Sequence, residues 1–201
     1  MYEPAEPLPS SLTLIQASLG SDDAERIERA YRFAAAAHEG QTRDEGTPFI
    51  EHPVRVAKVL WHELGVRDVE LLVAALQHDV IEDCEAVDRA LLASAFGERV
   101  AGLVVDVTKE TVPPGQRAAR DRAYLDKLPG LSTDARLLKL ADRIDNLRSI
   151  PQANDPAKAR RYLDVSRAEF LPLAAMTDPA ALRLVTEACD DIERILGESE
   201  R

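Results

Sequence analysis

Residues 75–83 read ALQHDVIED, and this stretch gives the strongest indication of both the fold and the chemistry of the chain. An adjacent His78-Asp79 pair is followed by Glu82 and Asp83, three and four residues after Asp79. If one helix runs through the motif, these carboxylates share a face, where like charges cost about 0.2–0.5 kcal/mol per pair. A bound cation would remove that cost, and so would solvent. The motif alone therefore leaves a metal site and an ordinary surface both open.

The stretch follows an apolar segment, LLVAAL (71–76), and helical periodicity extends outward from it in both directions. Gly and Pro stand between the periodic segments, and no window alternates long enough for a strand. Residues 41–51, with Gly46 and Pro48, are expected to form a loop or a small hairpin. The sequence therefore predicts an all-α, single-domain bundle of about eight to ten helices, with at most a minor hairpin. The expected helices cover about 22–39, 52–64, 68–79, 84–95, 97–109, 116–128, 133–149, 155–175 and 178–196.

The two ends of the chain differ from this helical body. Three of the twelve prolines fall within the first ten residues, so residues 1–20 are expected to form a loose arm. A short helix over 11–19 could interrupt it. One domain is expected over 21–196, since 201 residues suit a single core. Residues 197–201 are expected to form a C-terminal tail.

Composition and charge exclude several classes of function. A hydrophobic fraction of 45% with 30% charged residues is typical of a globular protein. The net charge of -11 argues against a nucleic-acid partner, because phosphate contacts need a basic surface. An anionic substrate would need local relief from this charge, supplied by a divalent cation and a few placed Arg or Lys side chains. No apolar run can span a bilayer and no signal-peptide pattern is present, so we expect a cytoplasmic protein without membrane contact.

A second segment, LKLADRIDNLRS (138–149), carries polar groups along one stripe of its expected helix. Asp142, Asn146 and Ser149 lie on this stripe, opposite an apolar face. Periodicity fits a solvated surface and the wall of a cleft equally well. Arg143 is expected to be an ion-pair or surface residue.

Two more segments contribute chemistry-bearing side chains. QTRDEGTPFIEHP supplies Arg43 and His52, and AKARRY supplies Lys158 and Tyr162. Neutral imidazole together with carboxylate suits Mn²⁺, Fe²⁺, Co²⁺ or Zn²⁺, and two His with two Asp would leave coordination positions open for water and substrate. A further histidine, His38, ends an Ala-rich segment, where a positively charged ring would suit the helix dipole. We expect His38 to be structural or exposed.

The combination of these segments, in this order, resembles the hydrolase domain of the Rel/Spo alarmone enzymes within the HD superfamily. The resemblance runs from about Tyr31 to about Tyr162 and is closest to a small stand-alone alarmone hydrolase, because no room remains for further domains. The stretches that carry it are AHEGQTRDEGTPFIEHPVRVA (37–57), ALQHDVIED (75–83), FGERVAGLVVDVTKE (96–110) and LLKLADRIDNLRS (137–149).

The resemblance implies an HD-type helical bundle and a divalent metal, usually Mn²⁺. It also implies an activity, the removal of the 3′-diphosphate from ppGpp or pppGpp, which leaves GDP or GTP and pyrophosphate. The substrate would then be a small nucleotide. By the same resemblance the site residues have the following roles: His52, His78, Asp79 and Asp142 as metal ligands; Glu82 and Asp83 as the acidic pair that activates water; and Arg43, Asn146, Ser149, Lys158 and Tyr162 as substrate-binding residues.

Three positions depart from the family pattern. Asp44 stands where many relatives have a second basic residue, Asp145 replaces a common His, and Cys84 replaces a Thr after the acidic pair. None of these changes removes a ligand, so they bear on the substrate more than on the reaction. An adenosine alarmone or the 2′-phosphate of NADPH therefore stays open as an alternative substrate. A non-catalytic nucleotide-binding regulatory module is the alternative from another class, although such a module would be expected to lose the acidic pair or a ligand, and this chain keeps all of them.

Overall fold

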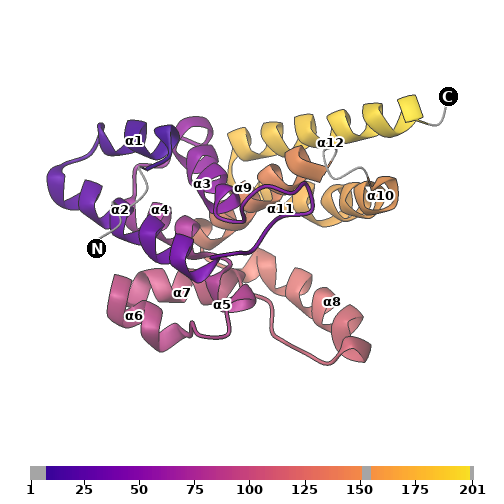
Figure 1. Ribbon diagram of the computed structural model, residues 1–201. Coiled ribbons are helices and arrows are strands. Elements are labelled where there is room, and N and C mark those ends of the chain that lie inside the picture. Colours follow the sequence, from indigo (N-terminus) through magenta and orange to yellow (C-terminus); the bar gives the residue numbers. More distant parts are fainter. Residues whose placement is uncertain (1–7, 151–154, 200–201) are drawn as a thin grey trace.

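The computed structural model describes residues 8–150 and 155–199, and over that part of the chain it is all-α, as expected (Figure 1). The only extended pairing among the described residues is a single bridge between Thr42 and Pro48, in the segment expected as a loop or small hairpin. Several helices run on from one another, as α10 does through η5 into α11. The elements are α1 (Ser10–Gln16), α2 (Ser21–Ala37), α3 (Glu51–Lys58), η1 (Val59–Glu63), α4 (Val69–Gln77), α5 (Val80–Asp83), α6 (Arg89–Phe96), α7 (Glu98–Val107), η2 (Pro114–Gln116), α8 (Arg117–Lys127), η3 (Leu128–Gly130), α9 (Thr133–Ser149), α10 (Pro156–Val165), η5 (Ser166–Phe170), α11 (Leu171–Thr177) and α12 (Pro179–Ser199).

Helix α4 forms the centre of the core. It begins where the Asp68 carboxylate accepts hydrogen bonds from the backbone amides of Glu70 and Leu71, which satisfies two donors at the helix start. All residues from 71 to 77 are buried, and α2, α3, α7 and α9 pack around the helix. Because its last turn is held on every side, α4 places the residue that follows it, His78, at a fixed position.

The helix does not continue through the His-Asp motif. α4 ends at Gln77 and α5 begins at Val80, with Asp79 at the start of α5. The helix expected over 68–79 thus ends two residues early, and the condition that one helix runs through the motif is not met, because the chain breaks at His78 and Asp79. The break frees His78 from the helical pattern, and its ring Nδ1 bonds to the carbonyl of Ala75, 2.8 Å away.

The helix expected over 84–95 also begins later than expected. Residues 84–88 form a loop, and α6 starts at Arg89 because the Asp88 carboxylate accepts a hydrogen bond from the amide of Leu91, 2.8 Å away. An Asp at this position competes for backbone donors and fixes the helix start.

Helix α9 lies against α3, α7, α11 and α12 and is the second structural support of the site. Its apolar face is buried, as the periodicity predicted. Its polar stripe is shielded from solvent too, since Asp142 is 5% exposed, Ser149 is 6% exposed and Asn146 is half-buried. The stripe is therefore the wall of a cleft and not a solvated surface.

The described part of the N-terminal segment packs on the domain. Leu12 and Ile15 of α1 are buried in the core, and α1 contacts α2 and α3. Residues 8–20, which we expected in a loose arm, thus extend the domain, and residues 1–7 lie outside the described part. At the other end α12 continues to Ser199, past the expected boundary at residue 196. None of the described helices combines the length and the apolar composition that crossing a membrane would need.

Candidate metal centre and active site

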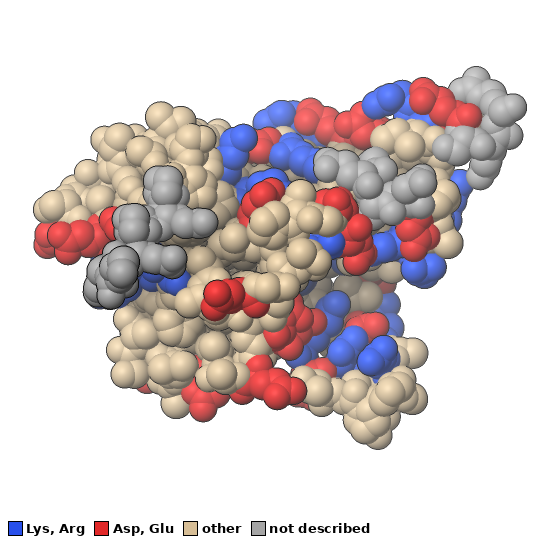
Figure 2. All heavy atoms as spheres, viewed as in Figure 1, with Lys and Arg blue, Asp and Glu red and all other residues tan. Residues whose placement is uncertain are grey.

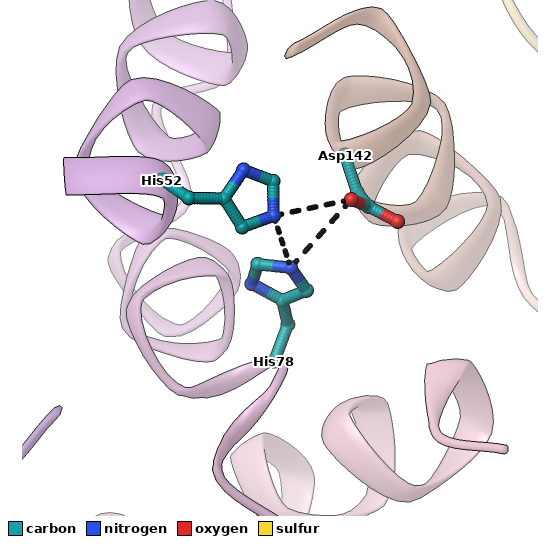
Figure 3. Close-up of side chains that lie close together, drawn as sticks. All are labelled: His52, His78 and Asp142. Carbon is teal, nitrogen blue, oxygen red and sulfur yellow. Dashed lines mark hydrogen bonds and ion pairs between the residues drawn. The ribbon is translucent and has the colours of Figure 1, made fainter. Parts of the chain in front are cut away.

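Three helices bring His52, His78 and Asp142 to one point (Figure 3). His52 comes from α3, His78 from the end of α4 and Asp142 from the middle of α9. The two imidazole Nε2 atoms lie 3.2 Å apart. The Oδ1 atom of Asp142 lies 3.2 Å from Nε2 of His52 and 3.8 Å from Nε2 of His78. All three side chains are buried.

Asp79 completes the set of four residues that the resemblance gives as ligands. Its Oδ1 lies 3.2 Å from Nε2 of His78, and its Oδ2 lies 3.4 Å from Nε2 of His52. The break between α4 and α5 makes this possible, because it allows adjacent residues to point to the same centre.

The hydrogen bonds of the two imidazoles show that this donor set fits a cation. Nδ1 of His52 lies 2.6 Å from a carboxylate oxygen of Asp145, and Nδ1 of His78 lies 2.8 Å from the carbonyl of Ala75. Both partners only accept, so both Nδ1 atoms carry the hydrogen. In the neutral rings the Nε2 lone pairs would then face each other across 3.2 Å. A positive charge between them resolves this repulsion, and imidazole with carboxylate suits Mn²⁺, Fe²⁺, Co²⁺ or Zn²⁺.

Without a metal, a proton can supply that charge. Burial lowers the pKa of His78, but the carboxylates of Asp79 and Asp142 outweigh burial and raise the pKa to about 10. A divalent cation would displace this proton, since metal ligands bind in their deprotonated form.

Asp145 is a functional candidate that sequence reasoning assigned elsewhere. We expected its departure from the family pattern to bear on the substrate, yet its carboxylate lies between His52 and Arg55. Nε of Arg55 donates to Oδ1 of Asp145 at 2.8 Å, while Oδ2 holds His52. A carboxylate on the outer nitrogen of a ligating imidazole fixes its tautomer and raises its basicity. The signal in the sequence was an extra Asp three residues after Asp142, but only the fold shows which side chain it meets.

Asp142 is held by two neighbours on its own helix. Nζ of Lys139 lies 2.7 Å from Oδ2 of Asp142, and the amide of Asn146 donates to Oδ1. Burial alone would raise the pKa of Asp142, but Lys139 and the two imidazoles hold it well below the usual value. Lys139 was not singled out from the sequence, although its spacing three residues before Asp142 is typical of a helical ion pair.

The acidic pair lies on α5 and is exposed. Oε2 of Glu82 accepts a hydrogen bond from the backbone amide of Lys109 at 3.1 Å. Partial desolvation and the carboxylates of Asp79 and Glu82 raise the pKa of Asp83 to about 6. A carboxyl group with a pKa near neutrality is suited to accept and release a proton.

His38 is linked to the acidic pair through Gln41. Its ring Nδ1 is 2.8 Å from Oε1 of Gln41, whose amide in turn donates to the carbonyl of Asp83 at 3.2 Å. Burial lowers the pKa of His38. Burial therefore acts against the positively charged ring that would suit the helix dipole, because desolvation disfavours a buried charge.

A pocket next to the metal centre gathers all five residues that the resemblance gives as substrate-binding. We name it the Arg43 pocket, after the side chain that donates to Oδ1 of Asn146 at 2.6 Å. Asn146 thus connects the pocket with Asp142. Across the pocket, Nζ of Lys158 forms an ion pair with the carboxylate of Asp44. The lining includes Arg43, Asp44, Phe49, Asn146, Ser149, Lys158 and Tyr162.

Comparison with known proteins places this arrangement in a family. The HD domain model matches residues 30–178, so the chain belongs to the HD domain family. All four candidate ligands and both acids of α5 lie within the matched range.

Relatives within the family share a common description. The human guanosine-3′,5′-bis(diphosphate) 3′-pyrophosphohydrolase MESH1 is 42% identical over 135 residues, which cover 66% of this chain and 73% of the relative. The bifunctional (p)ppGpp synthase/hydrolase SpoT of Escherichia coli K12 is 39% identical over 165 residues, 80% of this chain and 23% of the relative. A solved structure described as a metazoan ortholog of SpoT that hydrolyzes ppGpp superimposes with a TM-score of 0.75 at 27% identity, covering 83% of this chain and 94% of that one.

Proposed function

We propose that the chain is a divalent-cation-dependent phosphohydrolase that removes the 3′-diphosphate from guanosine alarmones. The products are GDP or GTP and inorganic pyrophosphate. The relatives at 39–42% identity are named for this reaction or for a bifunctional synthase/hydrolase that includes it. The metal we propose is Mn²⁺, with Fe²⁺, Co²⁺ or Zn²⁺ as other cations that the donor set would accept.

One observation carries the proposal: the opposed Nε2 atoms of His52 and His78 share one Asp142 oxygen, and Asn146 links that oxygen to the Arg43 pocket. A nucleoside in the Arg43 pocket would thus have a phosphate at its ribose 3′-position within reach of the centre. The pocket walls supply a guanidinium, an amide, a hydroxyl and an aromatic ring, which suit a ribose and a base.

The reaction exchanges one bond to phosphorus for another. The oxygen of a water molecule bonds to the phosphorus next to the ribose O3′, the bond from that phosphorus to O3′ breaks, and O3′ takes up a proton. A cation held by the four ligands would acidify the water and neutralise charge on the phosphate. We assign to Glu82 and Asp83 of α5 the acceptance of the proton from the water, and to the Arg43 pocket the binding of the nucleoside.

The experiment is turnover by the purified chain with and without added Mn²⁺. Three substrates are compared: guanosine tetraphosphate, its adenosine analogue and NADPH, with pyrophosphate and phosphate measured separately. We expect pyrophosphate from the guanosine substrate, dependent on Mn²⁺ and abolished by a chelator. Turnover of only the adenosine analogue or only NADPH would show that the substrate is that nucleotide and not a guanosine alarmone. The Asp44–Lys158 ion pair would then be the first contact to examine.

A second measurement separates an enzyme from a regulatory module that only binds nucleotide. Glu82→Ala should retain metal and lose rate by a factor of about 10²–10⁴, the usual contribution of a general base. Full activity of this variant would remove Glu82 from the mechanism. Nucleotide binding by the wild-type chain without any turnover would instead support the regulatory module.

A further inference from the structure

A second pocket adjoins the metal centre on the side where α8 faces α9 and α10. Figure 2 shows Lys and Arg side chains on both sides of the hollow between α8 and α10. We call it the basic pocket. Its lining includes Lys109, Asp121, Tyr124, Lys139, Arg143, Arg161 and Tyr162.

The charge of this pocket is opposite to that of the chain. The protein as a whole carries a net charge of -11, yet the lining has four cationic side chains and one acid. The acid, Asp121, already pairs with Arg120 at 2.8 Å. Lys139 pairs with Asp142, and Lys109, Arg143 and Arg161 form no ion pair within the part of the chain that the structure describes. A hollow in which three of four cations have no paired carboxylate among the described residues favours an anion, even in an acidic protein.

Arg143 lies deepest in this arrangement and differs from our expectation. It was expected at the surface or in an ion pair. Its guanidinium instead lies over two rings, 4.8 Å from the centroid of Tyr162 and 3.9 Å from that of Phe170, without a hydrogen bond or ion pair to any described residue. Aromatic faces stabilise a cation without neutralising it, so its donors stay available to an anion.

Lys109 and Lys139 add to the positive charge at the same wall. Both ammonium groups lie over the ring of Tyr124, at 5.4 Å and 5.3 Å from its centroid. Burial is the main cause that lowers the pKa of Lys109, and the nearby charge of Lys139 lowers it further. An anion between the two ammonium groups would relieve their repulsion.

Two contacts tie the basic pocket to the reaction centre. Lys139 touches the candidate ligand Asp142 at 2.7 Å, and the backbone amide of Lys109 donates to Glu82 at 3.1 Å. Tyr162 lines both pockets, with Lys158 on its ring at 5.7 Å and Arg143 at 4.8 Å. Tyr162 thus connects the Arg43 pocket with the basic pocket, and Lys139 connects the basic pocket with the metal centre.

We propose that the basic pocket binds the terminal phosphate of the 3′-diphosphate and holds the pyrophosphate product before release. The inference rests on the proposed function and names the site of the group that is transferred to water. With the nucleoside in the Arg43 pocket and the first phosphorus at the metal centre, the terminal phosphate extends to the other side of the centre. No bond to the terminal phosphorus changes in the reaction, so the pocket supplies binding and charge neutralisation.

Binding of inorganic pyrophosphate to the Mn²⁺-loaded full chain tests this directly, by titration calorimetry. Lys109→Ala and Arg161→Ala should each weaken binding about tenfold or more, because each removes a charge-assisted contact to phosphate. Arg160→Ala is the matched control. It removes the same charge from the neighbouring, exposed position of α10, which is outside the pocket lining, and should leave the affinity unchanged. Metal affinity, measured on the same variants, should not change.

Two substrates test whether the basic pocket binds the 3′-diphosphate or the 5′-diphosphate of the nucleotide. Guanosine tetraphosphate carries diphosphates at both ends, whereas guanosine 3′-diphosphate has a free 5′-hydroxyl. If the basic pocket holds the 3′-diphosphate, Lys109→Ala and Arg161→Ala raise KM for both. A rise with guanosine tetraphosphate alone would assign the pocket to the 5′-end and overturn the proposal.

The outcomes also separate this inference from the proposed function. The chain could turn over guanosine tetraphosphate normally while all variants bind pyrophosphate with equal affinity. This result would overturn the role of the basic pocket and leave the proposed function intact. Pyrophosphate affinity that depends on Lys109 and Arg161, in a chain that hydrolyses no guanosine alarmone, would support the anion site and overturn the substrate.

Discussion

Helices α4 and α8 both adjoin the site, and they are held in opposite ways. Seven consecutive residues of α4 are buried, and four helices pack around it. In α8 only Tyr124 is buried, and Figure 1 shows the helix projecting from the body. The proposed ligand His78 directly follows α4, whereas α8 forms one wall of the basic pocket. A centre that must hold a cation needs fixed atoms, and a pocket that admits a substrate benefits from a wall of low local stability.

The largest effect is expected when a proposed metal ligand next to the buried helix α4 is removed. Asp79→Ala should abolish metal binding and turnover together, because the variant loses a carboxylate that contacts both imidazoles. Calorimetric titration with Mn²⁺ and a pyrophosphate assay are the measurements. Residual Mn²⁺ binding with wild-type affinity would exclude Asp79 as a ligand.

Asp83 offers a test by pH. With a pKa of about 6, the carboxyl group is deprotonated above that pH, and only this deprotonated form can accept a proton from the water. The rate should therefore rise as the pH increases through about 6 and then level off, with the midpoint shifted downward by a bound cation. Asp83→Asn should lower kcat by about 10²-fold or more and remove this dependence. A profile that keeps the same rise in Asp83→Asn would assign the titration to another group.

The difference in packing predicts a difference in stability. Leu72→Ala in α4 should lower the free energy of unfolding by about 2–5 kcal/mol, because Leu72 is fully buried and its removal leaves a cavity. Chemical denaturation measures the change. A loss below about 1 kcal/mol would show that the core around α4 relaxes to fill the cavity. Helix α4 would then be held less rigidly than its burial indicates.

Asp145→Asn tests whether the carboxylate that contacts His52 contributes to metal binding. The substitution keeps the shape of the side chain but removes the charge that faces Nδ1 of His52 and Nε of Arg55. Mn²⁺ affinity should fall about 10–100-fold, as for other outer partners of ligating imidazoles. Asp164→Asn on the exposed face of α10 is the control. Equal affinities in the two variants would reduce Asp145 to a packing role.

The smallest expected effect is on α8. The hydroxyl of Tyr124 donates to the carbonyl of Val107 at 2.7 Å and is the buried link between α8 and the end of α7. Tyr124→Phe should cost about 1 kcal/mol, seen first as faster amide hydrogen exchange in α8. If α8 exchanges as slowly as α4 in the wild-type chain, the two helices do not differ in the way proposed.

Much of this architecture follows from periodicity and from helix-breaking residues. The helix expected over 133–149 is α9, and those expected near 116–128 and 178–196 match α8 and α12 within about three residues. Where the predicted helix boundaries were wrong, local hydrogen bonds set the observed ones. The Asp88 cap moved the start of α6, and the turn at His78 and Asp79 separated α4 from α5. Both are side-chain or backbone bonds that hydrophobic periodicity does not report.

By itself, the sequence determined the fold class, the metal-binding residue types and the HD resemblance, because these depend on residue identity and spacing along the chain. It could not choose between a solvated stripe and a cleft for Asp142, nor show that Asp145 faces His52, 93 positions away. It also assigned Arg143 to the surface or to an ion pair. Those answers depend on which faces of α3, α4, α9 and α10 meet, and only tertiary packing decides which polar groups lose their water and which charges they meet in its place.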